Sequence, residues 1–255
     1  MRSLNNATIS LASMVGFDRV AALAREAGIK SARGTPSMAI GSYDATPLDM
    51  AGAYTTFANG GIHLEPWMLA SVRTPTGDVI NDYLPDPKQV LDPRVAYLTV
   101  SLMQNVLHSD VTGSGTGAGV RNMGFTSPAA GKTGTSHDAW FAGFTSNLLC
   151  IVWVGNDDYT DVKIEGARAA APIWAEFMKR AVQLPQYSDT NNFSAPEGVD
   201  FVSIDSVSNL LSDASCPASF DAAFLAGTAP TETCDHPAEH RNLLQKIFGL
   251  GKNGN

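Results

Sequence analysis

The sequence predicts a mixed α/β fold in which helices and an antiparallel sheet form segregated layers. Three observations lead to this prediction. Apolar residues recur at helical spacing in the first half of the chain and again over 169–182. Two runs of aromatic and branched residues, 139–144 and 148–154, are separated by a short polar turn, which is typical of a β-hairpin. Hydrophobic residues make up 44% of the 255 residues, which is enough to bury a core between such layers.

The expected elements follow from these patterns in chain order. Helices are expected where an apolar face ends at a glycine or begins at a capping residue and a proline: 3–14, 17–27, 47–59, 93–106 and 169–182. In the last of these helices, Trp174, Phe177 and Met178 are expected to face inward. Strands are expected at 68–72 and 79–83, around a Pro-Thr-Gly-Asp turn, and in three successive segments from residue 130 onward.

Composition separates the chain into three parts and excludes some functions. We expect a main domain over 1–183, a polar, proline-containing linker over 184–198 and a loop-rich extension over 199–255. The net charge of −8 argues against a nucleic-acid-binding surface. No stretch approaches the ~18 consecutive apolar residues of a membrane span. We expect neither a cofactor nor a resident metal.

The segment Gly131-Lys132-Thr133-Gly134-Thr135 is the strongest candidate for a functional site. A lysine and two threonines surround a glycine, and an apolar strand pattern follows. Glycine allows another backbone to approach closely, and an exposed strand edge can pair with an extended peptide. A phosphate loop is excluded, because its first glycine would fall at position 126, which is threonine.

The three cysteines differ in their surroundings. Cys150 lies within an apolar run and is expected to be a buried thiol. We expect Cys216 and Cys234, in the polar extension, to form a disulfide. Two alternatives remain at this stage, namely unpaired thiols and a zinc site that would add His236 and His240.

Several segments in a fixed order resemble the transpeptidase domain of class A penicillin-binding proteins. Gly131–Thr135 resembles the K-T-G element of that family, and Ser3-Leu4-Asn5 resembles its S-x-N element. The helix and double glycine over 49–61, the Gly-Ser-Gly-Thr-Gly run over 113–117, and the extension with its two cysteines are similar too. The resemblance implies a β-lactamase/transpeptidase-like fold and no cofactor.

The resemblance also implies a reaction and a role for each matching residue. A serine would attack the D-Ala-D-Ala bond of a peptidoglycan stem peptide, and the acyl group would pass to an amine of a neighbouring stem. Ser3 and Lys132 would relay protons, and Asn5 would bind the substrate amide. Thr133 and Thr135, around Gly134, would bind the terminal carboxylate of a stem peptide or a β-lactam. Alternatively, Ser3 and Asn5 are helix caps and Lys132 is a solvated edge-strand lysine.

One family element does not occur in the sequence. The nucleophile of the family lies in S-x-x-K, and no serine here has a lysine three residues later. We therefore expect the C-terminal portion of a longer protein, with a fold incomplete at its N-terminus and inactive in isolation. Its partner would be its own N-terminal part, and it would reach the membrane only through an anchor in that part. The parent protein would act outside the cytoplasm, on the periplasmic face of the inner membrane.

Two other functions remain possible at this stage. The chain could be a non-catalytic module that binds wall peptide or a partner. It could also belong to a D,D-carboxypeptidase or β-lactamase of the same fold, although the extension and the helix over 49–61 look more like class A proteins.

Overall fold

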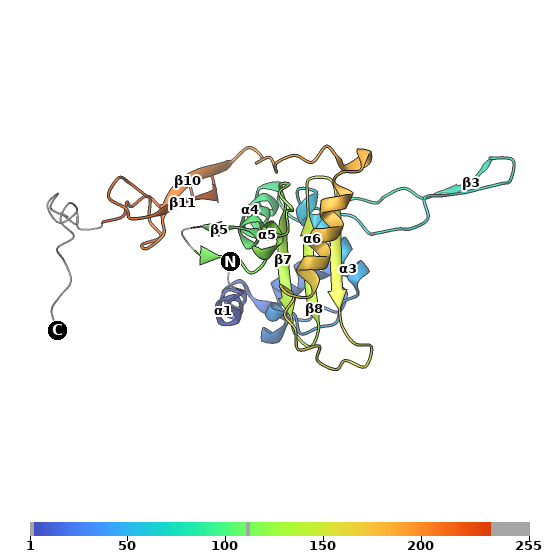
Figure 1. Ribbon diagram of the computed structural model, residues 1–255, viewed down its shortest axis with the longest axis horizontal. Helices are drawn as coiled ribbons and strands as arrows, with labels where there is room; N and C mark the ends of the chain where they lie inside the picture. The colour runs from blue at the N-terminus through green and yellow to red at the C-terminus, as the bar shows by residue number, and fades with distance from the viewer. Residues whose placement is uncertain (1–2, 111–112, 236–255) are drawn as a thin grey trace. The chain divides into compact units, whose positions relative to one another are not determined.

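The computed structural model describes residues 3–110 and 113–235. The chain divides into two compact units, one ending at Val199 and the other starting at Asp200. The first unit contains helices on both sides of a three-stranded antiparallel sheet, and the mixed α/β fold predicted from the sequence is confirmed (Figure 1). Among the described residues, no single helix is long and apolar enough to span a membrane; two consecutive helices, bent by 94°, meet that length and composition only together.

The central sheet consists of β7 (Ala130–Thr135), β8 (Ala139–Phe144) and β9 (Leu149–Val154). The strands are antiparallel and pair in the order β7-β8-β9, so β7 and β9 are edge strands within the described residues. Side chains alternate between the two faces of a strand. Lys132 therefore points to one face, together with Trp140 and Ala142, whereas Thr133 points to the other.

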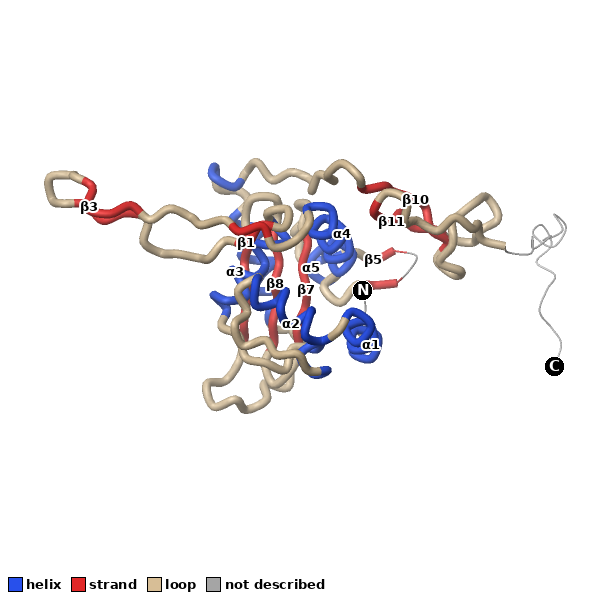
Figure 2. The backbone as a smooth tube through the Cα atoms, turned by 180° about the vertical axis from the view of Figure 1, so that it is seen from behind, coloured by secondary structure: helices blue, strands red, loops and turns tan. Residues whose placement is uncertain are grey.

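The remaining elements surround this sheet or form small hairpins. The helices of the first unit are α1 (Asn5–Val15), α2 (Phe17–Glu26), η1 (Pro36–Ile40), α3 (Pro47–Ala58), α4 (Pro93–Gln104), η2 (Asn105–Leu107), α5 (Gly119–Asn122), α6 (Ala170–Ala181) and η3 (Pro185–Tyr187). Three antiparallel strand pairs complete it: β1 (Ile62–His63) with β4 (Lys88–Gln89), β2 (Ser71–Arg73) with β3 (Val79–Asp82), and β5 (Ser109–Asp110) with β6 (Gly113–Ser114). The β2–β3 hairpin projects away from the sheet and its helices (Figure 2).

Helix α3 begins where its sequence predicts. The Thr46 hydroxyl accepts a hydrogen bond from the Asp49 N–H at 3.1 Å, and the Asp49 carboxylate accepts one from the Thr46 N–H at 2.9 Å. This reciprocal capping box satisfies two N–H groups at the helix start, and Pro47 has the backbone angle of the first turn. The helix ends before Gly60 and Gly61, as predicted.

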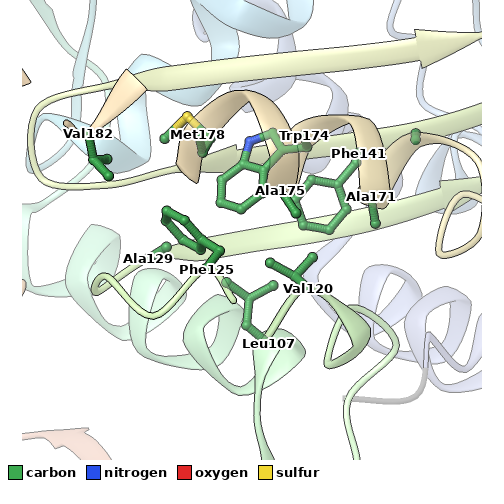
Figure 3. Packing of buried hydrophobic residues seen from close by; sticks show 11 residues of the cluster. Leu107, Val120, Phe125, Ala129, Phe141, Ala171, Trp174, Ala175, Met178 and Val182 are labelled. Atoms are coloured by element: carbon green, nitrogen blue, oxygen red, sulfur yellow. The ribbon is translucent and has the colours of Figure 1, made fainter. Parts of the chain in front are cut away.

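Helices cover both faces of the sheet. Helix α6 packs against β8 and β9 on one face, whereas α3 contacts β8 and β9 on the other, where α4 contacts β7. The core on the α6 side is built around Trp174, which is fully buried against Phe141 and Phe125 with ring centroids at 5.0 and 5.1 Å (Figure 3). Its indole N–H donates to the carbonyl of Gly143 at 3.1 Å, so its polar atom is satisfied inside the core.

One inward-facing residue was predicted wrongly. Trp174 and Met178 are fully buried, as expected, but the Phe177 side chain is 50% exposed. Residues 174 and 178 are four apart and lie on the same side of the helix, which faces the core. Phe177 and Ile173, also four apart, lie on the neighbouring side and face outward. Phe177 and Ile173 line a shallow apolar groove on the outer side of α6.

The polar segment 184–198 lies along the first unit. The Asn147 side chain donates to the carbonyl of Asp189 at 3.0 Å, and the Asn191 N–H donates to the Ser146 hydroxyl at 2.9 Å. Phe193 stacks edge-to-face on the buried Phe144. The segment is therefore held against the β8–β9 turn by both polar and apolar contacts.

The second unit is a small two-stranded structure with one disulfide. Its strands, β10 (Val199–Asp205) and β11 (Ser219–Leu225), pair with each other. Asp205 is fully buried at the end of β10, where its carboxylate accepts hydrogen bonds from the N–H and hydroxyl of Ser208, both at 2.7 Å. Cys216 and Cys234 are joined by a disulfide with Cα atoms 6.4 Å apart. This unit therefore combines a short hairpin with a covalent link.

Candidate active site

The K-T-G strand borders a cavity of about 850 Å³ in the first unit. The cavity runs along the edge strand β7 and is lined by residues from both of its faces, with Trp140 and Trp153 on its strand side and the segment 40–54 opposite. Residues 132–136 and Asn5 also line it. The cavity therefore brings together the first helix, the start of α3 and the central sheet.

Lys132 and Ser3, which are 129 residues apart in the sequence, are hydrogen-bonded to each other. The Lys132 ammonium donates to the Ser3 hydroxyl at 2.5 Å and to the carbonyl of Thr133 at 2.7 Å. Burial lowers the pKa of Lys132, because the charged form loses solvent. Ser3 has a φ of +51°, in the left-handed region that serines seldom adopt. A lysine with a lowered pKa beside a hydroxyl can exchange a proton with it.

Asn5 is the first residue of α1 and lines the same cavity as Lys132. The alternative of helix capping is wrong for Ser3 and Asn5, because the N-cap of α1 is Leu4 and no side chain caps it. The alternative of a solvated edge lysine is wrong for Lys132, because its side chain is half-buried and hydrogen-bonded. The two elements that resemble S-x-N and K-T-G thus converge on one cavity.

The two threonines of the strand are both hydrogen-bonded on the face opposite Lys132. The Thr133 hydroxyl lies 2.7 Å from the Thr116 hydroxyl, and the Thr135 hydroxyl accepts a hydrogen bond from the Gly166 N–H at 3.0 Å. Thr133 is buried, whereas Thr135 is exposed. Gly134 lies between them, and a Cβ at this position would meet the Trp140 side chain at 3.0 Å.

The sequence did not predict the far wall of this cavity. The wall is formed by 40–45, which includes Tyr43 and Asp44, and no motif in the sequence identifies this loop. At one end the Trp153 indole donates to the Asp138 carboxylate at 2.8 Å. His137 stacks on Tyr159 at 4.7 Å between ring centroids. His137 and Asp138 could have been expected near the cavity, because they directly follow the K-T-G element in the sequence.

The cysteines take two different states in the structure. Cys216 and Cys234 form the disulfide described above, and their sulfur atoms are therefore not the thiolates that zinc requires. Asp213 lies beside both sulfur atoms, and His236 and His240 of the zinc alternative lie outside the described residues. Cys150 is a half-buried free thiol, and burial raises its pKa to about 11.

The fold corresponds to that of penicillin-binding transpeptidases. The crystal structure of penicillin-binding protein 1A from Haemophilus influenzae superposes on 91% of this chain with a TM-score of 0.80 and 26% sequence identity. The alignment covers 40% of that protein. The structure of PonA1 from Mycobacterium tuberculosis covers 68% of this chain and 50% of its own, with a TM-score of 0.54 and 25% identity. The β-lactamase/transpeptidase-like fold implied by the resemblance is confirmed.

Sequence comparison gives the family. Residues 18–179 match the penicillin binding protein transpeptidase domain, and residues 195–239 match the C-terminal domain of penicillin-binding protein 1A. The first match covers more than half of the chain, which therefore belongs to the transpeptidase family of class A penicillin-binding proteins. Lys132, Thr133 and Thr135 lie within the matched range, whereas Ser3 and Asn5 precede it.

The similar curated proteins are much longer than this chain. Over 86% of its length, this chain is 34% identical to penicillin-binding protein 2D of Bacillus subtilis. Over 97% of its length, this chain is 30% identical to penicillin-binding protein 1A of Aquifex aeolicus. In both cases it spans 32% of the relative. The chain thus spans about a third of the length of these relatives.

Proposed function

We propose that this chain supplies the K-T-G and S-x-N parts of the site of a serine D,D-transpeptidase that cross-links peptidoglycan. The observation that carries the proposal is the hydrogen bond between Lys132 and Ser3, at a cavity that Asn5 also lines. Family membership supports recognition of β-lactams and of D-Ala-D-Ala stem peptides as substrate. The proposed place of action is the periplasmic face of the bacterial inner membrane, where stem peptides are cross-linked.

The proposed reaction assigns each group a task. A serine hydroxyl attacks the carbonyl between the two D-alanines; the serine ester forms, the C–N bond breaks and D-alanine leaves with a proton. Lys132 and Ser3 pass that proton to the leaving amine, and Asn5 holds the substrate amide. The Thr135 N–H donates to the oxyanion, and the threonine hydroxyls bind the terminal carboxylate. The amine of a second stem peptide then attacks the ester, which restores the serine.

The attacking serine must come from an S-x-x-K segment, and this sequence contains none. We therefore expect no covalent adduct between the 255-residue chain and a fluorescent penicillin. Fusion to an upstream segment that carries the family's S-x-x-K element should restore labelling. In that fusion, Lys132→Ala should slow labelling by about a hundredfold or more, within the range for loss of an acid–base group. Lys179→Ala, a surface lysine paired with Glu176, is the matched control.

Two results would contradict this proposal. Stoichiometric labelling of the 255-residue chain alone would indicate a different nucleophile. A folded fusion that binds stem peptide but does not react with penicillin would favour the second candidate, a wall-peptide-binding module. The absence of a serine followed by lysine at the third position is the observation that keeps this second candidate open.

A further inference from the structure

The threonine hydroxyls of the K-T-G strand each contact a group from a distant loop. Thr133 meets Thr116, which lies 17 residues earlier in the loop before α5. Thr135 meets the N–H of Gly166, which lies 31 residues later in the loop before α6. One loop that precedes β7 in the sequence and one loop that follows it therefore each contact one of the two threonine hydroxyls.

Both loops approach the neighbouring backbone more closely than a side chain would permit. A Cβ on Gly115, next to Thr116, would lie 2.3 Å from the carbonyl oxygen of Val106. A Cβ on Gly166 would lie 2.2 Å from the carbonyl oxygen of Gly134. Such distances are excluded for real Cβ atoms, so glycine is required at both positions. Each contact with a threonine thus depends on a glycine placed for close approach.

The hydrogen-bonding capacity of a hydroxyl shows what these contacts can do. A hydroxyl has one proton to donate and two lone pairs to accept. Because the Thr135 oxygen accepts from the Gly166 N–H, its own proton is available for another acceptor. In the Thr116–Thr133 pair either oxygen can be the donor. If Thr116 donates, the Thr133 proton becomes available in the same way.

A carboxylate bound beside the strand would favour the arrangement in which Thr116 donates to Thr133. Hydrogen bonds to a charged acceptor are roughly twice as strong as neutral ones, so Thr133 gains more by donating to the carboxylate than to Thr116. A chain in which Thr116 donates to Thr133, and Thr133 to the carboxylate, also strengthens each bond. Both threonines would then present protons to one ligand.

We propose that Thr116 and the Gly166 N–H are positioning groups that orient the hydroxyl protons of Thr133 and Thr135 toward the terminal carboxylate of an acyl-D-Ala-D-Ala ligand. This inference rests on the function proposed above. It assigns a role to two groups outside the K-T-G element, neither of which needs to touch the substrate. Their effect should therefore appear only with ligands that carry the carboxylate.

The test compares two ligands on the intact 255-residue chain. One is N-acetyl-L-Lys-D-Ala-D-Ala, and the other is the same tripeptide with a C-terminal amide. Their dissociation constants are measured by NMR shift titration for the wild type and for Thr116→Val, Thr116→Ser and Thr99→Val. Thr99 is a partly buried threonine on α4 whose hydroxyl donates to the Val95 carbonyl of its own helix, so it controls for the substitution itself.

Thr116→Val should weaken binding of the acid by about fivefold to tenfold, the effect of one hydrogen bond, and leave binding of the amide unchanged. Thr116→Ser should restore the affinity for the acid, because it returns the donor. Thr99→Val should match the wild type for both ligands.

The outcomes separate this inference from the function on which it rests. A wild type that binds acid and amide equally would contradict the carboxylate site, and with it the proposed function. A wild type that prefers the acid, together with an unchanged preference in Thr116→Val, would overturn only the role of Thr116. Failure of Thr116→Ser to restore the preference would also overturn it, because a packing defect would then explain the valine variant.

Discussion

Removal of the disulfide from the second unit should abolish its independent stability. Cross-linking two residues reduces the entropy of the unfolded chain, and a separation of 18 residues corresponds to about 3 kcal/mol at 25 °C. A unit of a few tens of residues has a total stability of only roughly 2–5 kcal/mol at typical values per residue. The Cys216→Ala/Cys234→Ala double variant should therefore lose most of the free energy that keeps β10 and β11 folded.

Hydrogen exchange followed by mass spectrometry measures this loss directly. Amides of β10 and β11 should exchange about a hundredfold faster in the double variant, since 3 kcal/mol corresponds to roughly two factors of ten. Amides of β7, β8 and β9 should keep their wild-type rates, because they belong to the other unit. Cys150→Ala is the control, since Cys150 is the free thiol. Unchanged protection of β10 and β11 in the double variant would refute the reasoning and show that the buried Asp205 network suffices.

Two further predictions concern the first unit. Thr46→Ala should lower the free energy of unfolding by about 1–2 kcal/mol in urea titrations, because it removes the capping box of α3, whereas Thr46→Ser should stay close to wild type. Equal losses in both variants would rule out the cap as the cause. Because burial lowers the pKa of Lys132, the unfolded chain binds more protons than the folded chain between that lowered pKa and the ordinary value of 10.5. The free energy of unfolding should therefore rise with pH through this window in the wild type relative to Lys132→Met; parallel pH profiles for the two proteins would contradict the prediction.

The sequence predicted those parts of the fold that depend on local pattern. The β8–β9 hairpin follows from two apolar runs around a short polar turn, and the start of α3 follows from Thr46 and Pro47. Phe177 was misplaced because a position beside the buried stripe of an amphipathic helix can face either way, and only the packed sheet decides. Local patterns thus fix elements more reliably than they fix the orientation of residues at the border of a buried face.

The candidate site could be predicted only in part. The pairing of Ser3 with Lys132 spans 129 residues, and only the family resemblance suggested it. Thr116 and Gly166 were not expected near the threonines of the strand, because their approach depends on which backbones pack together in three dimensions. The glycine-rich run around Thr116 was visible in the sequence, but its purpose, room for the Val106 carbonyl, was not.

The outer edge of β9 has a consequence for how the protein can associate with other chains. Both faces of β9 are covered, by α6 and by α3, yet among the described residues no strand pairs with its outer edge. A partner cannot stack on such a strand, but it can extend the sheet in its own plane through main-chain hydrogen bonds. Such pairing depends on main-chain hydrogen bonds more than on side-chain identity. The edge can therefore accept a strand from a partner segment or a strand from a second copy of the chain. A short peptide that occupies the edge should therefore act as a competitor of both.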